Sequence, residues 1–346
     1  MMFAFLMLLS TPNPKDVVVV EGSKWSRRSA RKREQIGGLL SSIQSPSFDI
    51  KGIVTPSSLV SQLFIDTLDA APVIDWSLYP NLDPQEGGML KADSPRATRK
   101  RRQIEAFVYI IRSTLQNRDA SAPSLKQVIV DAGSGAGNLA IPLAHILDCN
   151  VLAIDVNDVA LDRLKVRDDT VKTLCADLAS PTIELPPNAA IVCSLHACGA
   201  ATDLAIQLAT RHGLPFCVSP CCTAKALTVR KGASGSNRYG PSTSFQRSGS
   251  PLDMTYPRSK WLQSCLPTID AVKSYSQIAK VADVGLGPQT PSSQREHQRL
   301  AKVIVELDRL AGVVERHNYS VGIFRIQDHD NYGKSEIMIG VPPLVL

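Results

Sequence analysis

The sequence predicts an α/β fold in which a doubly wound, mostly parallel sheet forms the core. Three observations lead to this prediction. Short buried-strand runs alternate with helical patterns from residue 127 onward, a glycine-rich turn follows the first run, and a helix and two strands close the chain. The 346 residues are 44% hydrophobic, so the chain can bury a full core in one large domain with an extension or in two modest domains.

A long amphipathic helix is expected ahead of the sheet, at 96–117. Its apolar stripe consists of Ile104, Phe107, Val108, Ile111 and Leu115. Its first turns carry five cations, Arg96, Arg99, Lys100, Arg101 and Arg102. Positive charge at a helix N-terminus opposes the macrodipole, so this cluster indicates either an anionic ligand or a solvated face.

The alternating segments follow in order along the chain. Strands are expected at 127–133, 150–155, 173–178, 189–196, 215–219, 320–326 and 335–342, and helices at 138–147, 158–167, 201–212 and 302–319. Pro142 lies inside the first of these helices, which is tolerable only if that helix begins near Asn138 or later.

We expect residues 1–74 to be an N-terminal extension, partly disordered, and residues 75–346 to be the sheet domain, with a mobile loop at about 228–253. A helix is expected at 57–71. The first ten residues are apolar but too short to span a bilayer, and no basic residue precedes them. We favour a cytoplasmic protein without a membrane partner, although the basic stretch 23–34 could close an organellar presequence.

The segment "VIVDAGSGAGNLA" is the most informative local motif. A buried strand runs into Asp131, and Gly133, Gly135 and Gly137 follow before a helix begins. Glycine suits such a turn because it permits unusual φ and ψ values and lets a ligand approach the backbone. A dinucleotide fingerprint would place its third small residue where this chain has Asn138.

Three acids follow successive strands. Besides Asp131, Asp155 ends the next strand and Asp177 follows the one after it. Asp131 suits the ammonium group of S-adenosylmethionine, Asp155 suits the two ribose hydroxyls, and Asp177 suits the adenine amino group. A structural glycine turn with ordinary surface acids and a dinucleotide-dependent dehydrogenase are the alternatives.

Several motifs in their order resemble a known family. They are "DSPRATRKRRQIEAFVYII", "VDAGSGAGNLAIPLAHIL", "SLHACGAATD" with "SPCC", "VELDRLAGVVERHNYSVGI" and "IMIGVPP". From about Asp75 to Leu344 the chain resembles the methyltransferase-like domain of the glutathione S-transferase C-terminal domain-containing protein family, and more distantly a family of tRNA ribose 2′-O-methyltransferases. The resemblance implies a Rossmann-like class I S-adenosylmethionine-dependent methyltransferase, with a seven-stranded, mostly parallel sheet and an antiparallel last strand.

The sequence also departs from these families. We see neither a glutathione-transferase-like region in the first 60 residues nor the Cys/His zinc-finger module of the tRNA enzymes. Asp155 stands where the animal relatives have Glu, which keeps the hydrogen-bonding role. These departures concern the substrate rather than the fold.

The strings "SLHACGAATD" and "SPCC" fall at the ends of two expected strands. Leu195 should line the cofactor side, and His196 is a candidate general base or a satisfied core histidine. Asp203 either orients His196 or starts the next helix. The cysteines of these strings (Cys198, Cys221, Cys222) could be walls of small thiols, a metal site or a nucleophile. We expect walls and no metal, because adjacent cysteines rarely both reach one ion. Seven of the eight cysteines lie between Cys149 and Cys222, a distribution that favours reduced thiols over disulfides.

The net charge of +6 favours an anionic partner. With the other basic segments, Arg99, Lys100 and Arg102 could form a rim that binds RNA phosphates, or they could be a solvated face. Few aromatic residues are present to stack bases. The sequence therefore predicts a methyltransferase that uses S-adenosylmethionine and acts on RNA, with tRNA favoured. The alternatives are an inactive binding module of the same fold and a methyltransferase of proteins or small molecules.

Overall fold

A computed structural model describes residues 74–84, 94–116, 126–198, 200–223, 256–266, 271–283, 292–326 and 336–343. The expected helix at 57–71, nearly all of the N-terminal extension and the expected loop at 228–253 lie outside these residues. The division into an extension and a sheet domain therefore stays a prediction. No helix within the described ranges is both long enough and apolar enough to cross a bilayer.

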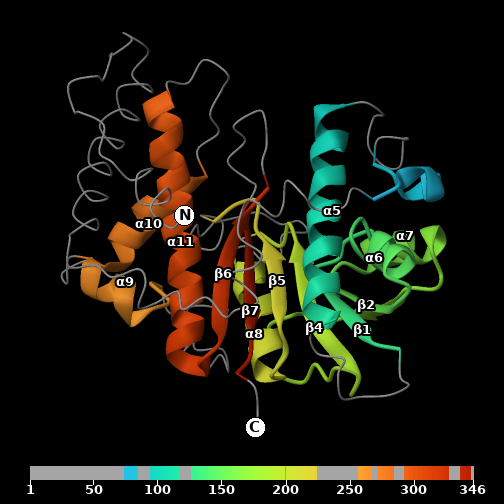
Figure 1. The fold of residues 1–346 in the computed structure, drawn as a ribbon. Coiled ribbons are helices and arrows are strands. Elements are labelled where there is room, and N and C mark those ends of the chain that lie inside the picture. Colours follow the sequence, from blue (N-terminus) through green and yellow to red (C-terminus); the bar gives the residue numbers. More distant parts are fainter. Residues whose placement is uncertain are drawn as a thin grey trace.

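The described residues form a seven-stranded sheet with the order β3-β2-β1-β4-β5-β7-β6 (Figure 1). The first five strands pair in parallel, and β7 pairs antiparallel with both β5 and β6. The predicted fold class is confirmed. The strands are β1 (Val128–Ala132), β2 (Asn150–Asp155), β3 (Lys172–Cys175), β4 (Ala189–Leu195), β5 (Phe216–Ser219), β6 (Ser320–Arg325) and β7 (Glu336–Val341).

Helices cover both faces of the sheet. The helices are α5 (Pro95–Gln116), α6 (Ala140–Ile146), α7 (Asp158–Arg167), α8 (Ala200–Arg211), α9 (Lys260–Cys265), α10 (Ala271–Ala282) and α11 (Ser292–His317). Strand residues alternate between two cores: Ile129 and Ile191 pack with α5 and α6, whereas Val130 and Val192 pack with α8 and α11. Apolar residues at every strand position are what a sheet covered on both faces requires.

Two differences from the sequence-based prediction concern the C-terminal half. We expected neither α9 nor α10, and α11 begins at Ser292 rather than near Lys302. Both extra helices pack on α11, beside the sheet, around Tyr275 and Ile278 (Figure 1), and the start of α9 donates two backbone N–H groups to Glu315 near the end of α11. The apolar spacing of α10 is a signal that could have revealed it.

Two further local features are explained by the structure. Because α6 begins at Ala140, Pro142 stands in its first turn, where a missing N–H costs no helical hydrogen bond. Ahead of α5 the chain forms two short 3-10 helices, Trp76–Leu78 and Pro80–Leu82. The buried Trp76 donates its ring N–H to Glu105 Oε1 at 2.7 Å, which fastens this segment to α5.

A buried charge cluster joins α11 to the start of β7. Lys302 Nζ lies 2.5 Å from Glu336 Oε2 and 3.5 Å from Glu306 Oε1, and all three residues are buried. One cation thus faces two carboxyl groups. Burial, partly offset by Lys302, raises the pKa of Glu306 to about 7.

Glu306→Gln is expected to stabilise the protein at pH 8 and to change little at pH 5. As pH rises from 4.5 to 7, the unfolded chain releases this proton before the folded chain does, so the stability of the wild type falls. The full penalty, at most about 3 kcal/mol, is present above pH 7 and is absent from the glutamine variant. Thermal unfolding at both pH values measures the difference. Glu336→Gln, which removes the closer partner of Lys302, should destabilise at both. An equal effect of Glu306→Gln at the two pH values would contradict this explanation.

Candidate active site

The glycine turn between β1 and α6 folds over the end of β2. Gly133, Gly135 and Gly137 have φ values of +77°, +56° and +80°, a region that other residues rarely adopt. The N–H of Gly133 donates to the carbonyl of Ile154 at 2.7 Å. A Cβ on Gly137 would lie 2.8 Å from Leu164 Cγ, so this glycine also permits the packing of α7.

Asp155 is held against this turn by two backbone N–H groups. Its Oδ2 accepts from Gly135 at 2.7 Å and its Oδ1 from Asn157 at 2.9 Å. A carboxylate has about four lone-pair sites, so two remain for a ligand. Because the side chain is fixed and half-buried, it could accept hydrogen bonds from a pair of neighbouring hydroxyls without reorganising.

Asp131 is buried in β1, and its Oδ2 has no hydrogen-bond partner. Burial raises its pKa to about 7, although the positive charge of Lys100 opposes the shift. A buried carboxyl group of this kind needs a proton or a cation. The ammonium group of S-adenosylmethionine would supply that cation, so the carboxyl group of Asp131 fits this cofactor.

The remaining predicted cofactor residues lie at the same edge of the sheet. Asp177 is exposed, two residues beyond the end of β3, and its Oδ1 accepts from the N–H of Ala179 at 2.9 Å. Leu195 ends β4, and its side chain is part of the core shared with α5. The structure thus brings the three acids to the ends of three adjacent strands, and their roles toward the cofactor stay predictions. We call the ends of β1 to β5 with the segments that follow them the carboxyl edge.

His196 stands at the carboxyl edge immediately after β4. It is exposed, its φ is +70°, and its Nε2 lies 3.1 Å from Gln103 Oε1 on α5. Such backbone conformations in residues other than glycine often occur at functional sites. Gln103 was not predicted, because a contact over 93 positions has no local signal in the sequence.

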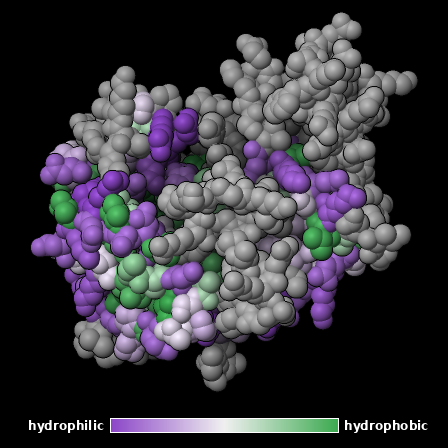
Figure 2. All heavy atoms as spheres, turned by 180° about the vertical axis from the view of Figure 1, so that it is seen from behind, coloured by the Kyte–Doolittle hydropathy of each residue, from purple (hydrophilic) through white to green (hydrophobic). Residues whose placement is uncertain are grey.

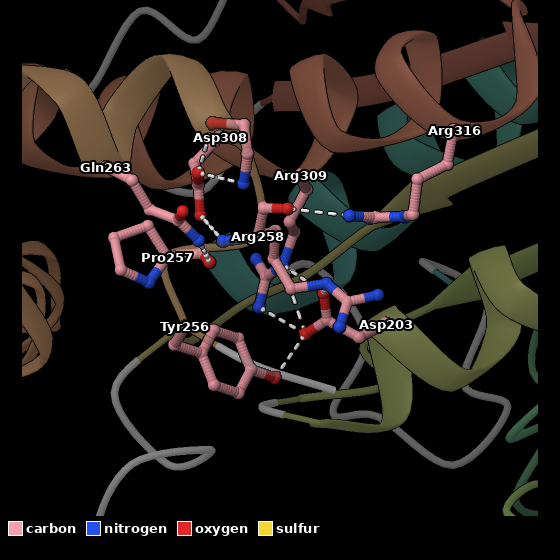
Figure 3. A network of polar contacts seen from close by, with 9 residues as sticks. Asp203, Tyr256, Pro257, Arg258, Gln263, Asp308, Arg309 and Arg316 are labelled. Atoms are coloured by element: carbon pink, nitrogen blue, oxygen red, sulfur yellow. Dashed lines mark hydrogen bonds and ion pairs between the residues drawn. The ribbon is translucent and has the colours of Figure 1, made fainter. Parts of the chain in front are cut away.

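The contacts of Asp203 bear on the two roles expected for it (Figure 3). This residue is buried in α8, and its Oδ2 accepts from the hydroxyl of Tyr256 at 2.9 Å and from Arg309 at 3.2 Å. Arg258 lies 3.7 Å from its other oxygen. These contacts connect α8 to α11, and Asp203 stands in the first turn of α8, as expected of an acid that starts the helix. Its role in orienting His196 stays a prediction.

The cations expected to form an RNA-binding rim differ in their surroundings, and Lys100 interacts electrostatically with Asp131. Burial lowers the pKa of its ammonium group to about 8, and the negative charge of Asp131 opposes that shift. Arg99 and Arg102 are half-buried on the same helix. Arg101 contacts Asp83 at 3.5 Å and Glu105 at 3.6 Å, which gives it a structural role.

Two pairs of cysteines have contrasting surroundings. Cys193 and Cys217 are buried within strands, and burial raises the pKa of each thiol, as expected of inert wall residues. Cys198 and Cys221 are joined by a disulfide, contrary to the expectation of reduced thiols. The Sγ atoms of Cys221 and Cys222 lie 3.6 Å apart.

Gly135→Ala is expected to weaken S-adenosylmethionine binding at least tenfold while leaving the fold intact. A Cβ there would meet no atom within 4 Å, so the chain itself has room for it. The left-handed backbone costs about 1–2 kcal/mol, and the methyl group would stand where the ligand approaches the turn. Gly213→Ala is the matched control, because Gly213 has a φ of +62° and equally open surroundings at the end of α8. Thermal unfolding should show equal destabilisation in both variants. Titration calorimetry should show a loss of affinity for S-adenosylmethionine in Gly135→Ala and none in Gly213→Ala.

The sheet order, the glycine turn and the acids at the strand ends define the class I methyltransferase fold, and the chain contains a domain of this class. Residues 99–228 match a family model described as a methyltransferase domain. The chain is related to the glutathione S-transferase C-terminal domain-containing proteins of Bos taurus and Homo sapiens, each 28% identical over 272 residues. The Drosophila melanogaster homolog is 28% identical over 274 residues.

These alignments cover 78% of this chain but only 37% of the mammalian relatives and 40% of the fly relative, so the chain spans little more than a third of their length. Among solved structures, the CurJ carbon methyltransferase is similar at 10% identity and a TM-score of 0.38, with 99% of this chain and 78% of that chain covered. The family match shows a methyltransferase domain of the S-adenosylmethionine-dependent kind.

Proposed function

We propose that this protein transfers the methyl group of S-adenosylmethionine to RNA, with tRNA as the first substrate to test. The observation that carries the proposal is the buried, unpartnered Oδ2 of Asp131 beside a glycine turn that also fixes Asp155. Both groups lie at the edge where His196 is exposed. A cation-binding carboxyl, a hydroxyl-binding carboxylate and a titratable ring are what binding the donor and deprotonating an acceptor require.

S-adenosylmethionine, when bound, supplies a methyl group already activated on a sulfonium. The protein then has to position the two substrates and accept one proton. Nε2 of His196 lies 3.1 Å from Oε1 of Gln103, an oxygen that can only accept a hydrogen bond, so this contact suits a ring that donates from Nε2. In a neutral ring with its proton on Nε2, Nδ1 would be the atom that takes a proton from a hydroxyl or an amine of the acceptor.

The choice of RNA rests on charge. Arg96 is exposed and Arg99 and Arg102 are half-buried on the first turns of α5, the part of the helix that reaches His196 through Gln103. Seen from behind, the described surface is mostly hydrophilic, with hydrophobic residues in small groups (Figure 2). A cationic rim beside the candidate base suits a phosphate polymer better than an apolar acceptor.

The double variant Arg99→Ala/Arg102→Ala is expected to bind tRNA about five- to tenfold more weakly at 0.1 M salt. The slope of log K against log salt concentration should become less steep by up to about two, because up to two phosphate contacts are lost. Arg163→Ala/Lys165→Ala removes two exposed cations of α7 and is the control. Filter binding over a salt series measures both. Equal losses in the two double variants would indicate nonspecific attraction.

Transfer of a radiolabelled methyl group to fractionated total RNA, protein and metabolites tests the proposed reaction. Label in the RNA fraction supports it. Label only in protein or metabolites indicates the other methyltransferase class, and binding of the cofactor without transfer indicates an inactive module.

A further inference from the structure

Three cysteine side chains meet at the carboxyl edge between β4 and β5. Cys198, Cys221 and Cys222 are each half-buried, and their Sγ atoms all lie within 4.8 Å of one another. They follow two strands that pair in parallel, with Leu195 opposite Ser219. This pairing places a segment from each strand end side by side, so residues 23 positions apart come into contact.

Adjacent cysteines can point the same way here because the strand has already ended. β5 stops at Ser219, Pro220 follows, and side chains no longer alternate between the two faces. The Sγ atoms of Cys221 and Cys222 are 3.6 Å apart. Two thiolates on one tetrahedral zinc ion, with Zn–S bonds of about 2.3 Å, lie about 3.8 Å apart. The observed separation therefore matches an edge of a zinc tetrahedron and removes the objection drawn from their adjacency in the sequence.

The third cysteine is close enough to complete a face of that tetrahedron. Cys198 is bonded to Cys221, and a dithiol or phosphine reductant, supplying two electrons, converts this disulfide to two thiols. Binding of a metal then releases the thiol protons. In contrast, Cys193 and Cys217 are fully buried in strands and face no such cluster.

We propose that the reduced protein binds one zinc ion through Cys198, Cys221 and Cys222. Three protein ligands leave the fourth tetrahedral position for a water molecule or another ligand from outside this set, which is the pattern of reactive rather than closed zinc sites. The site borders the candidate active site, because the N–H of His196 donates to the carbonyl of Ser219 at 3.0 Å. A bound ion would fix the ends of β4 and β5 at the side where an acceptor arrives. This site does not depend on methyl transfer.

The test uses the full chain, reduced with a phosphine, desalted without oxygen and titrated with ZnCl₂ or CoCl₂. We expect one zinc ion per chain by elemental analysis after gel filtration, and with cobalt we expect the visible bands of a tetrahedral thiolate complex. Cys198→Ser and Cys222→Ser should weaken binding at least tenfold. Cys149→Ser is the matched control, because Cys149 is also half-buried and lies outside the cluster.

Cys222→His provides a second variant if the serine variants fail to fold, since it restores a ligand and should keep the metal with an altered cobalt spectrum. Circular dichroism establishes which variants are folded. The proposal is overturned if the reduced wild type binds no metal, or if folded Cys198→Ser and Cys222→Ser both retain it with unchanged affinity.

Discussion

Replacing Asp155 by alanine is expected to weaken the binding of S-adenosylmethionine about 100-fold. The carboxylate is fixed by the N–H groups of Gly135 and Asn157, and its remaining lone pairs are placed to accept two ribose hydroxyls. Hydrogen bonds to a charged group contribute about 1.5–3 kcal/mol each, so the loss of two corresponds to about two orders of magnitude or more. Equilibrium dialysis with labelled cofactor measures the change.

Asp162→Ala is the control for this variant. Asp162 is an exposed acid on the neighbouring helix α7, and its removal changes the net charge equally. Its effect on affinity should stay within about twofold, because exposed charges are screened at physiological salt. If Asp155→Ala bound the cofactor as tightly as Asp162→Ala does, Asp155 would have no role in the site.

Asp203→Ala is expected to destabilise the protein by about 3–5 kcal/mol, because it leaves Arg309 charged and buried without its main partner. The guanidinium of Arg309 contacts both oxygens of Asp203, with Nε at 3.2 Å from Oδ1 (Figure 3). Denaturant unfolding followed by circular dichroism measures the loss.

Tyr256→Phe is the milder comparison in the same network. It removes one hydrogen bond to Asp203 and keeps the ring stacked on Tyr275, so about 1 kcal/mol should be lost. A stable Asp203→Ala variant that binds S-adenosylmethionine but transfers no methyl group would contradict a purely structural role and support a catalytic one.

Much of the sheet was predictable because its signal is local. The expected bounds of β2 and α7 agree with the structure residue for residue, since each is a continuous apolar or amphipathic run between turn residues. The positions of Asp131 and Asp155 followed from the same runs, because parallel strands end at one edge of the sheet.

The remaining features depend on contacts between distant segments. The partners of Asp203 lie 53 and 106 positions away, in Tyr256 and Arg309, and no local pattern distinguishes a buried ion pair from a helix-starting acid. The electrostatic interaction of Lys100 with Asp131 depends on how α5 packs against the sheet. The disulfide depends on two strand ends that meet only in the folded chain.

Titration calorimetry of the wild-type chain with S-adenosylmethionine tests the central claim most directly. We expect saturable binding of one cofactor per chain, competed by S-adenosylhomocysteine and strengthened as pH rises from 6 to 8, because Asp131, with its pKa raised to about 7 by burial, becomes an anion over that range. Absence of binding at cofactor concentrations up to the millimolar range would contradict the assignment of the glycine turn and its acids.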